Sequence, residues 1–317
     1  MCTVRRINLK TSCKDEVNGR ADLLDYCLNH EKQWLAIGWS ECTKGAVTFQ
    51  EYIDLYKMDL ENTYREKLKK NSASRRPRVN HVINVFQIIN DNDLFWTRDL
   101  YGYYWICRVI GKPEVYYNED LDIGAVVPVK AYKCGLEVPG QIKSSFNRPN
   151  GGTCEDLPTG IVTEYTKYVY NQLSQGKEQF QYQVMKKDGN LLDNLPEFEL
   201  EELVISYLQI KENYYVLSNS IAKKSTTVHI ECEMISRDPQ NIRKAVVQVK
   251  AREFNAADYL EYVRDGFYIY LYAQDVKYSD NLPENVVIIR PDQLLEFYKQ
   301  YKSILPESIT KWENLFI

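Results

Sequence analysis

Short apolar runs alternate with amphipathic runs from residue 197 onward, and this order restricts the fold more than any other feature of the chain. Apolar residues at helical spacing predict helices over 199–210, 255–265 and 290–302. Runs rich in β-branched and aromatic residues predict strands at 214–220, 227–235, 243–251, 266–273 and 285–291. This α–β–β–β–α–β–β–α order predicts an α/β domain with a mixed sheet flanked by helices.

The first 160 residues have a different pattern, which is mostly β with a few helices. Helices are predicted over 20–30, 48–70 and 80–89, and strands over 34–40, 93–99 and 103–111, with further short strands to about residue 147. Thr48 followed by Glu51 is a capping-box signal at the start of the second helix. Turn-forming residues over 148–160 predict a boundary. We therefore expect an N-terminal domain at 1–160, a helix and linker at 161–196, and a C-terminal domain at 197–317.

The charge of the chain excludes a generally basic nucleic-acid binder, because the 317 residues carry a net charge of −4. One local run is strongly basic and contains a single acid, Glu66; its basic members are Arg65, Lys67, Lys69, Lys70, Arg75, Arg76 and Arg78. This run is either a solvated loop or an arm that contacts phosphates, with Arg75, Arg76 and Arg78 as the first candidates for phosphate binding.

Two further patterns indicate the compartment. The chain has no apolar window of membrane-spanning length and no apolar stretch for a signal peptide near residue 1, so we expect a cytoplasmic protein without membrane contact. Its eight cysteines include no C-x-x-C pair, which favours free thiols over a zinc site.

Polar residues recur at every second position in two of the predicted C-terminal strands. Glu231 and Glu233 lie in one strand, and Gln248 and Lys250 lie in the next. Residues two apart in a strand share a face. An acid, a glutamine and a lysine on neighbouring strands can bind a divalent cation such as Mg²⁺ and hold a water molecule near the lysine.

The segments FELEELVISYL (198–208), ECEMIS (231–236) and VVQVKA (246–251) resemble the Mrr-like branch of the PD-(D/E)xK nuclease superfamily. The resemblance implies that Glu233 is the strand acid, although Asp is usual there. It also implies that Lys250 is the catalytic lysine, that Gln248 and the Val249 carbonyl are further metal ligands, and that Glu199 or Glu202 is the helix carboxylate.

The segments WLAIGWS (34–40), NDNDLFWTRD (90–99) and YYWICRVIG (103–111) resemble EVE and PUA-like barrels. That resemblance implies a small β-barrel that holds a modified, flipped base in an aromatic cage. The alternative is that the aromatic residues form the barrel core. The foremost candidates for base binding are Trp39, Ser40, Asp93, Trp96 and Tyr104, followed by Asp99, Tyr103 and Trp105, with Phe146 and Arg148 closing the pocket.

Together the two halves resemble modification-dependent (type IV) restriction endonucleases. The resemblance implies a Mg²⁺-dependent DNA endonuclease that recognises modified DNA and acts as a homodimer. Two alternatives stay open: a non-catalytic nucleic-acid reader or adaptor with a decayed nuclease fold, and a nuclease that acts on RNA or on unmodified DNA.

Overall fold

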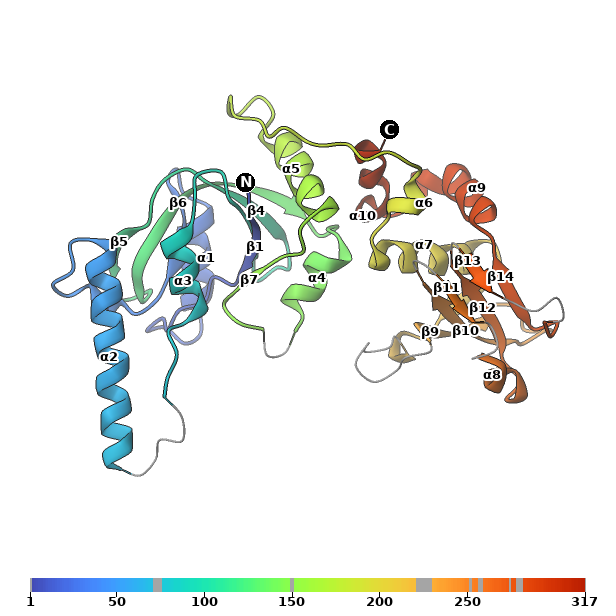
Figure 1. The fold of residues 1–317 in the computed structure, drawn as a ribbon, viewed down its shortest axis with the longest axis horizontal. Coiled ribbons are helices and arrows are strands. Elements are labelled where there is room, and N and C mark those ends of the chain that lie inside the picture. The colour runs from blue at the N-terminus through green and yellow to red at the C-terminus, as the bar shows by residue number, and fades with distance from the viewer. Residues whose placement is uncertain are drawn as a thin grey trace. The chain divides into compact units, whose positions relative to one another are not determined.

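The computed structural model describes residues 2–70, 76–148, 151–220, 230–250, 253–255, 259–273, 275–277 and 282–316. The chain divides into two compact units, residues 1–184 and 185–317 (Figure 1). Both units are mixed α/β. The first contains a curled, half-barrel sheet, and the second contains a separate sheet with its own helices.

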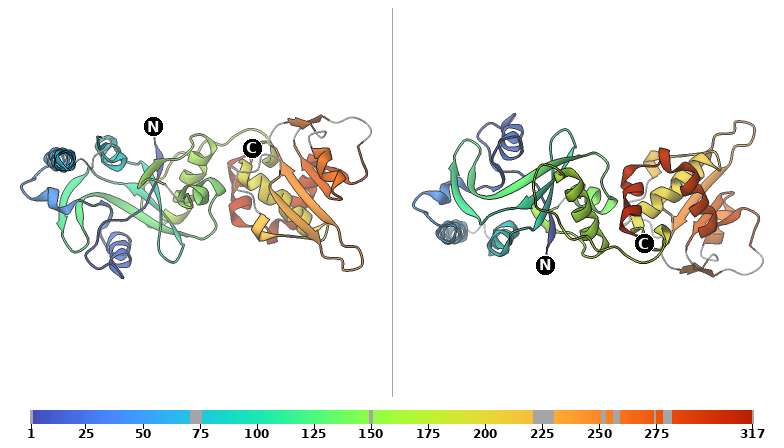
Figure 2. Two further views of the ribbon diagram at one scale, coloured as in Figure 1. Left: turned by 90° about the horizontal axis from the view of Figure 1, so that it is seen from below. Right: turned by 90° about the horizontal axis from the view of Figure 1, so that it is seen from above.

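The sheet of the N-terminal unit has seven strands and curls around its core (Figure 2). The strand order is β2-β6-β4-β3-β1-β7, and β5 also pairs with β6. The long strand β6 makes the curl possible, because its first half pairs with β2 and β5 and its second half pairs with β4. The strands are β1 (Val4–Ile7), β2 (Gln33–Ile37), β3 (Leu94–Arg98), β4 (Tyr104–Val109), β5 (Glu114–Asn118), β6 (Ile123–Gly135) and β7 (Cys154–Asp156).

Helices pack around this sheet. They are α1 (Gly19–Leu28), α2 (Phe49–Lys69), α3 (His81–Ile88), α4 (Gly140–Phe146) and α5 (Ile161–Ser174), with a 3₁₀ turn η1 (Ser40–Thr43). The capping box predicted for α2 is confirmed: Glu51 N donates to Thr48 Oγ1, and Thr48 N donates to Glu51 Oε2. Only the first turns of α2 contribute buried side chains, and the rest of the helix extends away from the sheet (Figure 1).

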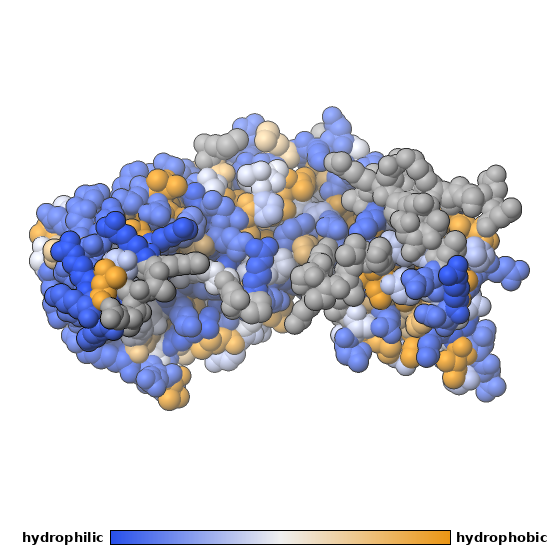
Figure 3. All heavy atoms as spheres, turned by 60° about the horizontal axis from the view of Figure 1, so that its bottom comes forward, coloured by the Kyte–Doolittle hydropathy of each residue, from blue (hydrophilic) through white to orange (hydrophobic). Residues whose placement is uncertain are grey.

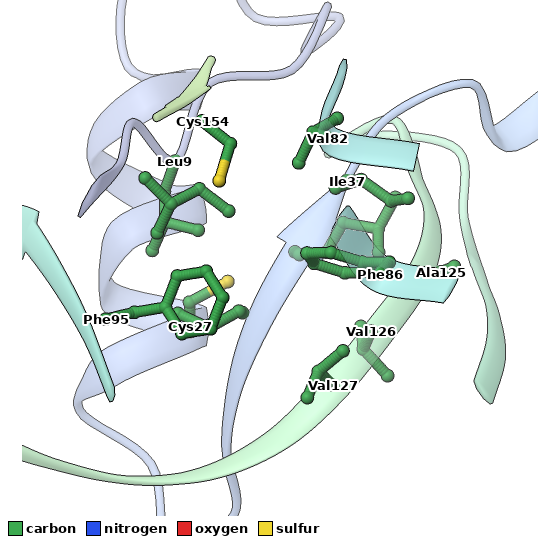
Figure 4. Packing of buried hydrophobic residues seen from close by; sticks show 14 of the residues in the cluster. Leu9, Cys27, Ile37, Val82, Phe86, Phe95, Ala125, Val126, Val127 and Cys154 are labelled. Carbon is green, nitrogen blue, oxygen red and sulfur yellow. The ribbon is translucent and has the colours of Figure 1, made fainter. Parts of the chain in front are cut away.

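Figure 4 shows the main core of this unit, where side chains from several elements point toward one another. Phe86 of α3, Phe95 of β3 and Cys27 of α1 lie with Val127 of β6, and all four are almost fully buried. The burial of these apolar groups holds α1 and α3 against the sheet.

The sequence prediction was wrong for one N-terminal element. Residues up to Phe146 were expected to continue as a strand, but 140–146 form helix α4. The reason is a four-residue spacing of buried apolar groups, since Val138, Ile142 and Phe146 are all buried. Strands β1 and β7 were not predicted.

The C-terminal unit is built on a five-stranded mixed sheet in the order β14-β12-β10-β9-β8. Strand β9 is antiparallel to β8 and β10, whereas β10, β12 and β14 are parallel. The predicted pairing of the two polar strands is therefore confirmed. The strands are β8 (Tyr214–Val216), β9 (Cys232–Ser236), β10 (Lys244–Val249), β12 (Tyr268–Tyr272) and β14 (Val286–Ile289), with a separate pair, β11 (Glu253–Asn255) and β13 (Asp275–Lys277).

Helices complete this unit: α6 (Leu191–Asn194), α7 (Glu197–Ile210), α8 (Leu260–Arg264), α9 (Pro291–Tyr301) and α10 (Glu307–Thr310). Helix α7 contacts β8 and β10, and α8 contacts β12. Hydrophilic residues cover most of the face drawn in Figure 3, with hydrophobic residues in small separate groups. Among the described residues, no helix has both the length and the apolar character needed to cross a membrane.

Candidate functional site

The pairing of β9 with β10 brings one acid directly beside the predicted glutamine. Val246 pairs with Glu233 and Val247 with Cys232, and Glu231 N donates to Val247 O at 2.7 Å. Glu231 therefore lies next to Gln248, and Gln248 Nε2 donates to Glu231 Oε1 at 2.7 Å. The same nitrogen donates to Val249 O at 3.0 Å.

The register also places Glu233, the acid that the sequence resemblance favoured. Glu233 lies opposite Val246, two residue pairs further from the predicted lysine than Glu231. Its backbone N–H donates to Ser220 Oγ at 2.8 Å. Glu231 is the residue directly before β9 and Glu233 lies within it, and Glu231 accepts the hydrogen bond from the Gln248 amide.

Gln248 is nearly completely buried, with 1% of its surface exposed. Its Oε1 is buried as well and has no hydrogen-bond partner among the described residues. A buried acceptor without a donor is costly, so this oxygen is available to a cation or a water molecule.

Lys250 follows Gln248 at the end of β10. Lys250 lies one residue past Val249, the last residue of β10, and strand alternation continued by one residue predicts its side chain on the face of Gln248. The Lys250 side chain is half-buried, and its backbone N–H donates to Tyr272 O at 2.9 Å, which fixes the end of β10 against β12. Within the described ranges, the Lys250 ammonium makes no ion pair.

Two glutamates of helix α7, Glu201 and Glu202, lie near enough to Cys232 of β9 for their charges to act on its thiol. Glu199 is buried and Glu202 is exposed. Burial, and to a smaller extent the negative charges of Glu231, Glu202, Glu201 and Glu233, together raise the pKa of the Cys232 thiol to about 12. In the described part of the chain, however, no three His, Cys, Asp or Glu side chains converge as metal ligands.

The oxygen atoms around Gln248 nevertheless suit Mg²⁺. Mg²⁺ is held in many sites by one or two carboxylates, with water molecules and substrate phosphates completing its shell. Glu231 offers one carboxylate, Val249 offers a backbone carbonyl, and the unpartnered Oε1 of Gln248 offers a third oxygen. These donor types suit a weakly held hard cation, and it is the Nε2 of Gln248 that contacts the other two oxygens.

In the N-terminal unit, two of the predicted base-binding residues belong to the core. Trp96 is 0% exposed, and its Nε1 donates to Thr166 Oγ1 of α5 at 3.1 Å. Asp93 is 1% exposed, and its carboxylate accepts from Arg5 Nη1 and from Thr3 N, both at 2.9 Å. Neither side chain presents a free face or a free acceptor to a base.

The other predicted pocket residues are also separated. Tyr104 is buried and lies edge-on to Phe146, with ring centroids 5.6 Å apart. Ser40 is buried, and its N–H donates to Asp122 Oδ1 at 2.9 Å. The Trp105 indole donates to Asp99 Oδ2 at 3.0 Å. The Lys133 ammonium lies over the Tyr103 ring, and Arg148 is paired with Glu155. The structure thus does not bring the predicted aromatic residues into one cage.

Trp39 does line a cavity, of about 180 Å³. The other lining residues come from five separate segments and were not predicted; they are Lys10, Thr11, Ser12, Ile37, Gly38, Val82, Asp122 and Thr153. The indole is partly exposed and packs against Tyr56, with ring centroids 4.7 Å apart.

The backbone around this cavity is strained. Trp39 and Asp122 both have positive φ values, 62° and 47°, although neither is glycine. The Asp122 carboxylate accepts from Ser12 N and Ser40 N and so joins two walls. A Cβ on Gly124 would lie 2.6 Å from Gly38 O, so the close approach requires glycine. Such conformations cluster at ligand sites because the surrounding structure must maintain them.

The basic run is only partly described. Arg75 lies outside the described residues. Arg76 is exposed and pairs with Glu61 at 2.9 Å, and Arg65 pairs with the same carboxylate at 3.4 Å. The hydrogen bond from Arg76 lowers the pKa of Glu61. Arg78 is exposed and has no ion pair with a described residue.

Comparison with known proteins adds little. No protein-family model matches the chain, and no curated protein matches it. One solved structure is similar, a MspJI restriction endonuclease in complex with a 27-mer oligonucleotide, with 9% sequence identity and a TM-score of 0.21. The match covers 71% of this chain and 66% of that one. A likeness of this size carries no inference about this chain.

Proposed function

We propose that this chain is a Mg²⁺-dependent endonuclease whose C-terminal unit hydrolyses DNA and whose N-terminal unit binds a modified base. The observation that carries the proposal is the hydrogen bond between Gln248 of β10 and Glu231, the residue directly before β9, with Lys250 one residue past the end of β10. A carboxylate, oxygen ligands and a lysine in this arrangement suit phosphodiester hydrolysis.

Each residue has a distinct role in this proposal. Glu231, Val249 and Gln248 would hold the cation through their oxygen atoms. When bound, Mg²⁺ stabilises negative charge on the phosphate and lowers the pKa of water. The Lys250 ammonium stabilises the charge that develops on the phosphate oxygens and orients the attacking water.

The cavity beside Trp39 is the proposed base pocket. Base flipping costs a few kcal/mol, and stacking on an aromatic face returns about 1–3 kcal/mol per base. Trp39 offers a partly exposed ring, and Ser12 and Thr11 supply polar atoms at the wall. The exposed Lys10 lies at the same cavity, where its charge suits a neighbouring phosphate.

The test is cleavage of plain, methylated and glucosylated duplex DNA, with Mg²⁺ and with a chelator. We expect cleavage only of modified DNA and only with Mg²⁺. Glu231→Gln and Lys250→Met should abolish cleavage and leave DNA binding intact, because both groups act on the transition state more than on the ground state. Glu233→Gln is the matched control and should cleave like the wild type.

A non-catalytic reader is the second candidate, because no three acidic, histidine or cysteine side chains meet around a metal position in the described residues. Binding of modified DNA without cleavage of any substrate would establish the reader and refute the nuclease. Cleavage of RNA or of plain DNA would refute the modified-base role of the cavity. A nuclease that cuts both strands needs two active sites, so we also propose a homodimer, which sedimentation on DNA would test.

A further inference from the structure

The Gln248 amide has an unusual pair of partners. Its Nε2 donates both to Glu231 Oε1, at 2.7 Å, and to Val249 O, at 3.0 Å. These two oxygens are the atoms that the proposed function assigns to the cation. The amide nitrogen therefore makes the two contacts that the cation would make.

The other end of the amide supports this interpretation. Oε1 is buried and has no hydrogen-bond partner in the described part of the structure. If the amide turned, Oε1 would face Glu231 Oε1 and Val249 O, and three oxygens would then face one position. Without a cation that arrangement is repulsive, because all three atoms are acceptors.

We infer that Gln248 closes the metal site: its amide nitrogen takes the place of the cation, and the metal enters only when the amide turns. The inference rests on the proposed function for the identity of the ion. It gives the partly buried Glu231 carboxylate a hydrogen-bond donor at the place of the cation. It also makes Gln248 the residue that sets metal affinity, because the cation must displace two hydrogen bonds.

A glutamate at this position would act in the opposite way. In Gln248→Glu the donor is lost, and two carboxylates face each other across β9 and β10. The variant should be less stable than the wild type in chelator and should gain stability from divalent metal, because binding to the folded state alone stabilises it. Gln240→Glu is the matched control, since Gln240 is an exposed residue of the same unit.

The experiment measures Mn²⁺ binding and thermal unfolding of the full chain without DNA. Gln248→Glu should bind Mn²⁺ roughly tenfold or more tightly than the wild type, the factor expected when a hydrogen bond to a charged group no longer competes. Its melting temperature should rise with Mg²⁺, whereas the wild type and Gln240→Glu should respond weakly. Equal Mn²⁺ affinity in the wild type and Gln248→Glu would overturn the inference.

A second measurement uses the wild type, so that it stands even when Gln248→Glu does not fold. The Gln248 side-chain NH₂ signals, assigned by their absence in a Gln248→Met spectrum, should exchange slowly with solvent in chelator. Saturating Mg²⁺ should shift them and speed their exchange. Unchanged signals at saturation would refute the closed site. If both metal-binding results are as expected but the wild type cleaves no DNA, the closed metal site stands and the hydrolytic function is refuted.

Discussion

Replacing Trp96 with alanine should destabilise the N-terminal unit strongly, because the structure makes this residue part of the core. The side chain is 0% exposed. Truncation of a buried tryptophan costs about 3–5 kcal/mol. In a unit of this size each kcal/mol moves the melting temperature by roughly 2–4 °C, so the expected loss is about 6–20 °C.

The indole hydrogen bond makes a separate and smaller contribution. Trp96 Nε1 donates to Thr166 Oγ1 at 3.1 Å, and Thr166 Oγ1 itself donates to Val162 O at 2.8 Å within α5. Trp96→Phe keeps much of the apolar contact and loses this bond, so it should lose about 0.5–1.5 kcal/mol for the bond plus the cost of the smaller ring. Thr166→Val removes the acceptor and should leave the indole N–H buried without a partner.

The assay is calorimetric unfolding of the full chain, followed by DNA binding below the melting temperature. Trp39→Ala is the informative contrast. Its ring is partly exposed at the cavity, so it should melt closer to the wild type and lose the preference for modified DNA. A Trp96→Ala protein that melts like the wild type would refute the assignment of Trp96 to the core.

Two further predictions concern charge. If the basic run contacts phosphates, Arg78→Ala should reduce the slope of log binding constant against log salt concentration by about 0.9. Arg76→Ala should change the slope less, because Arg76 is already paired with Glu61. Equal changes in the two variants would contradict this. Burial raises the pKa of Cys27 from its ordinary 9.0 to about 12 and that of Cys232 to about 12, so above pH 9 the unfolded chain loses thiol protons that the folded chain keeps. Stability should therefore fall as pH rises from 9 toward 12, and denaturant midpoints measured across that range check it; a constant midpoint in this range would argue against the buried thiols.

The elements that the sequence predicted well are those with local signals. Helix α2 begins at Thr48 because the capping box lies entirely within four residues. Strand β1 had no such signal, because Arg5 and Arg6 are charged and yet buried. Their partners are distant in sequence: Arg5 pairs with Asp93, and Arg6 pairs with Glu155. A buried arginine strand can be recognised only when the acids that neutralise it are known.

The aromatic residues illustrate the same limit. Trp39 and Trp96 both follow apolar runs, and sequence spacing gave no reason to separate them. Four of the five residues of β3 are buried, so alternation cannot tell a pocket face from a core face. The wall opposite Trp39 includes Lys10 and Asp122, which are 29 residues before and 83 residues after it in the chain. Only the tertiary fold brings them to one cavity.

The choice between Glu231 and Glu233 depends on register alone. The two acids are two residues apart in the strand predicted over 227–235, and a shift of two residues leaves the predicted face unchanged, so the alternating pattern predicts either acid equally. The register is set by the connection between the strands, where Arg243 N donates to Ser236 Oγ and Ser236 Oγ donates to Asn241 O. That connection puts Glu231, and not Glu233, within reach of Gln248. Glu231→Gln and Glu233→Gln make the same chemical change on the same face. A difference between them in metal-dependent cleavage would therefore report the register of β9 on β10, whereas equal loss would require both carboxylates in the site and would contradict the pairing described here.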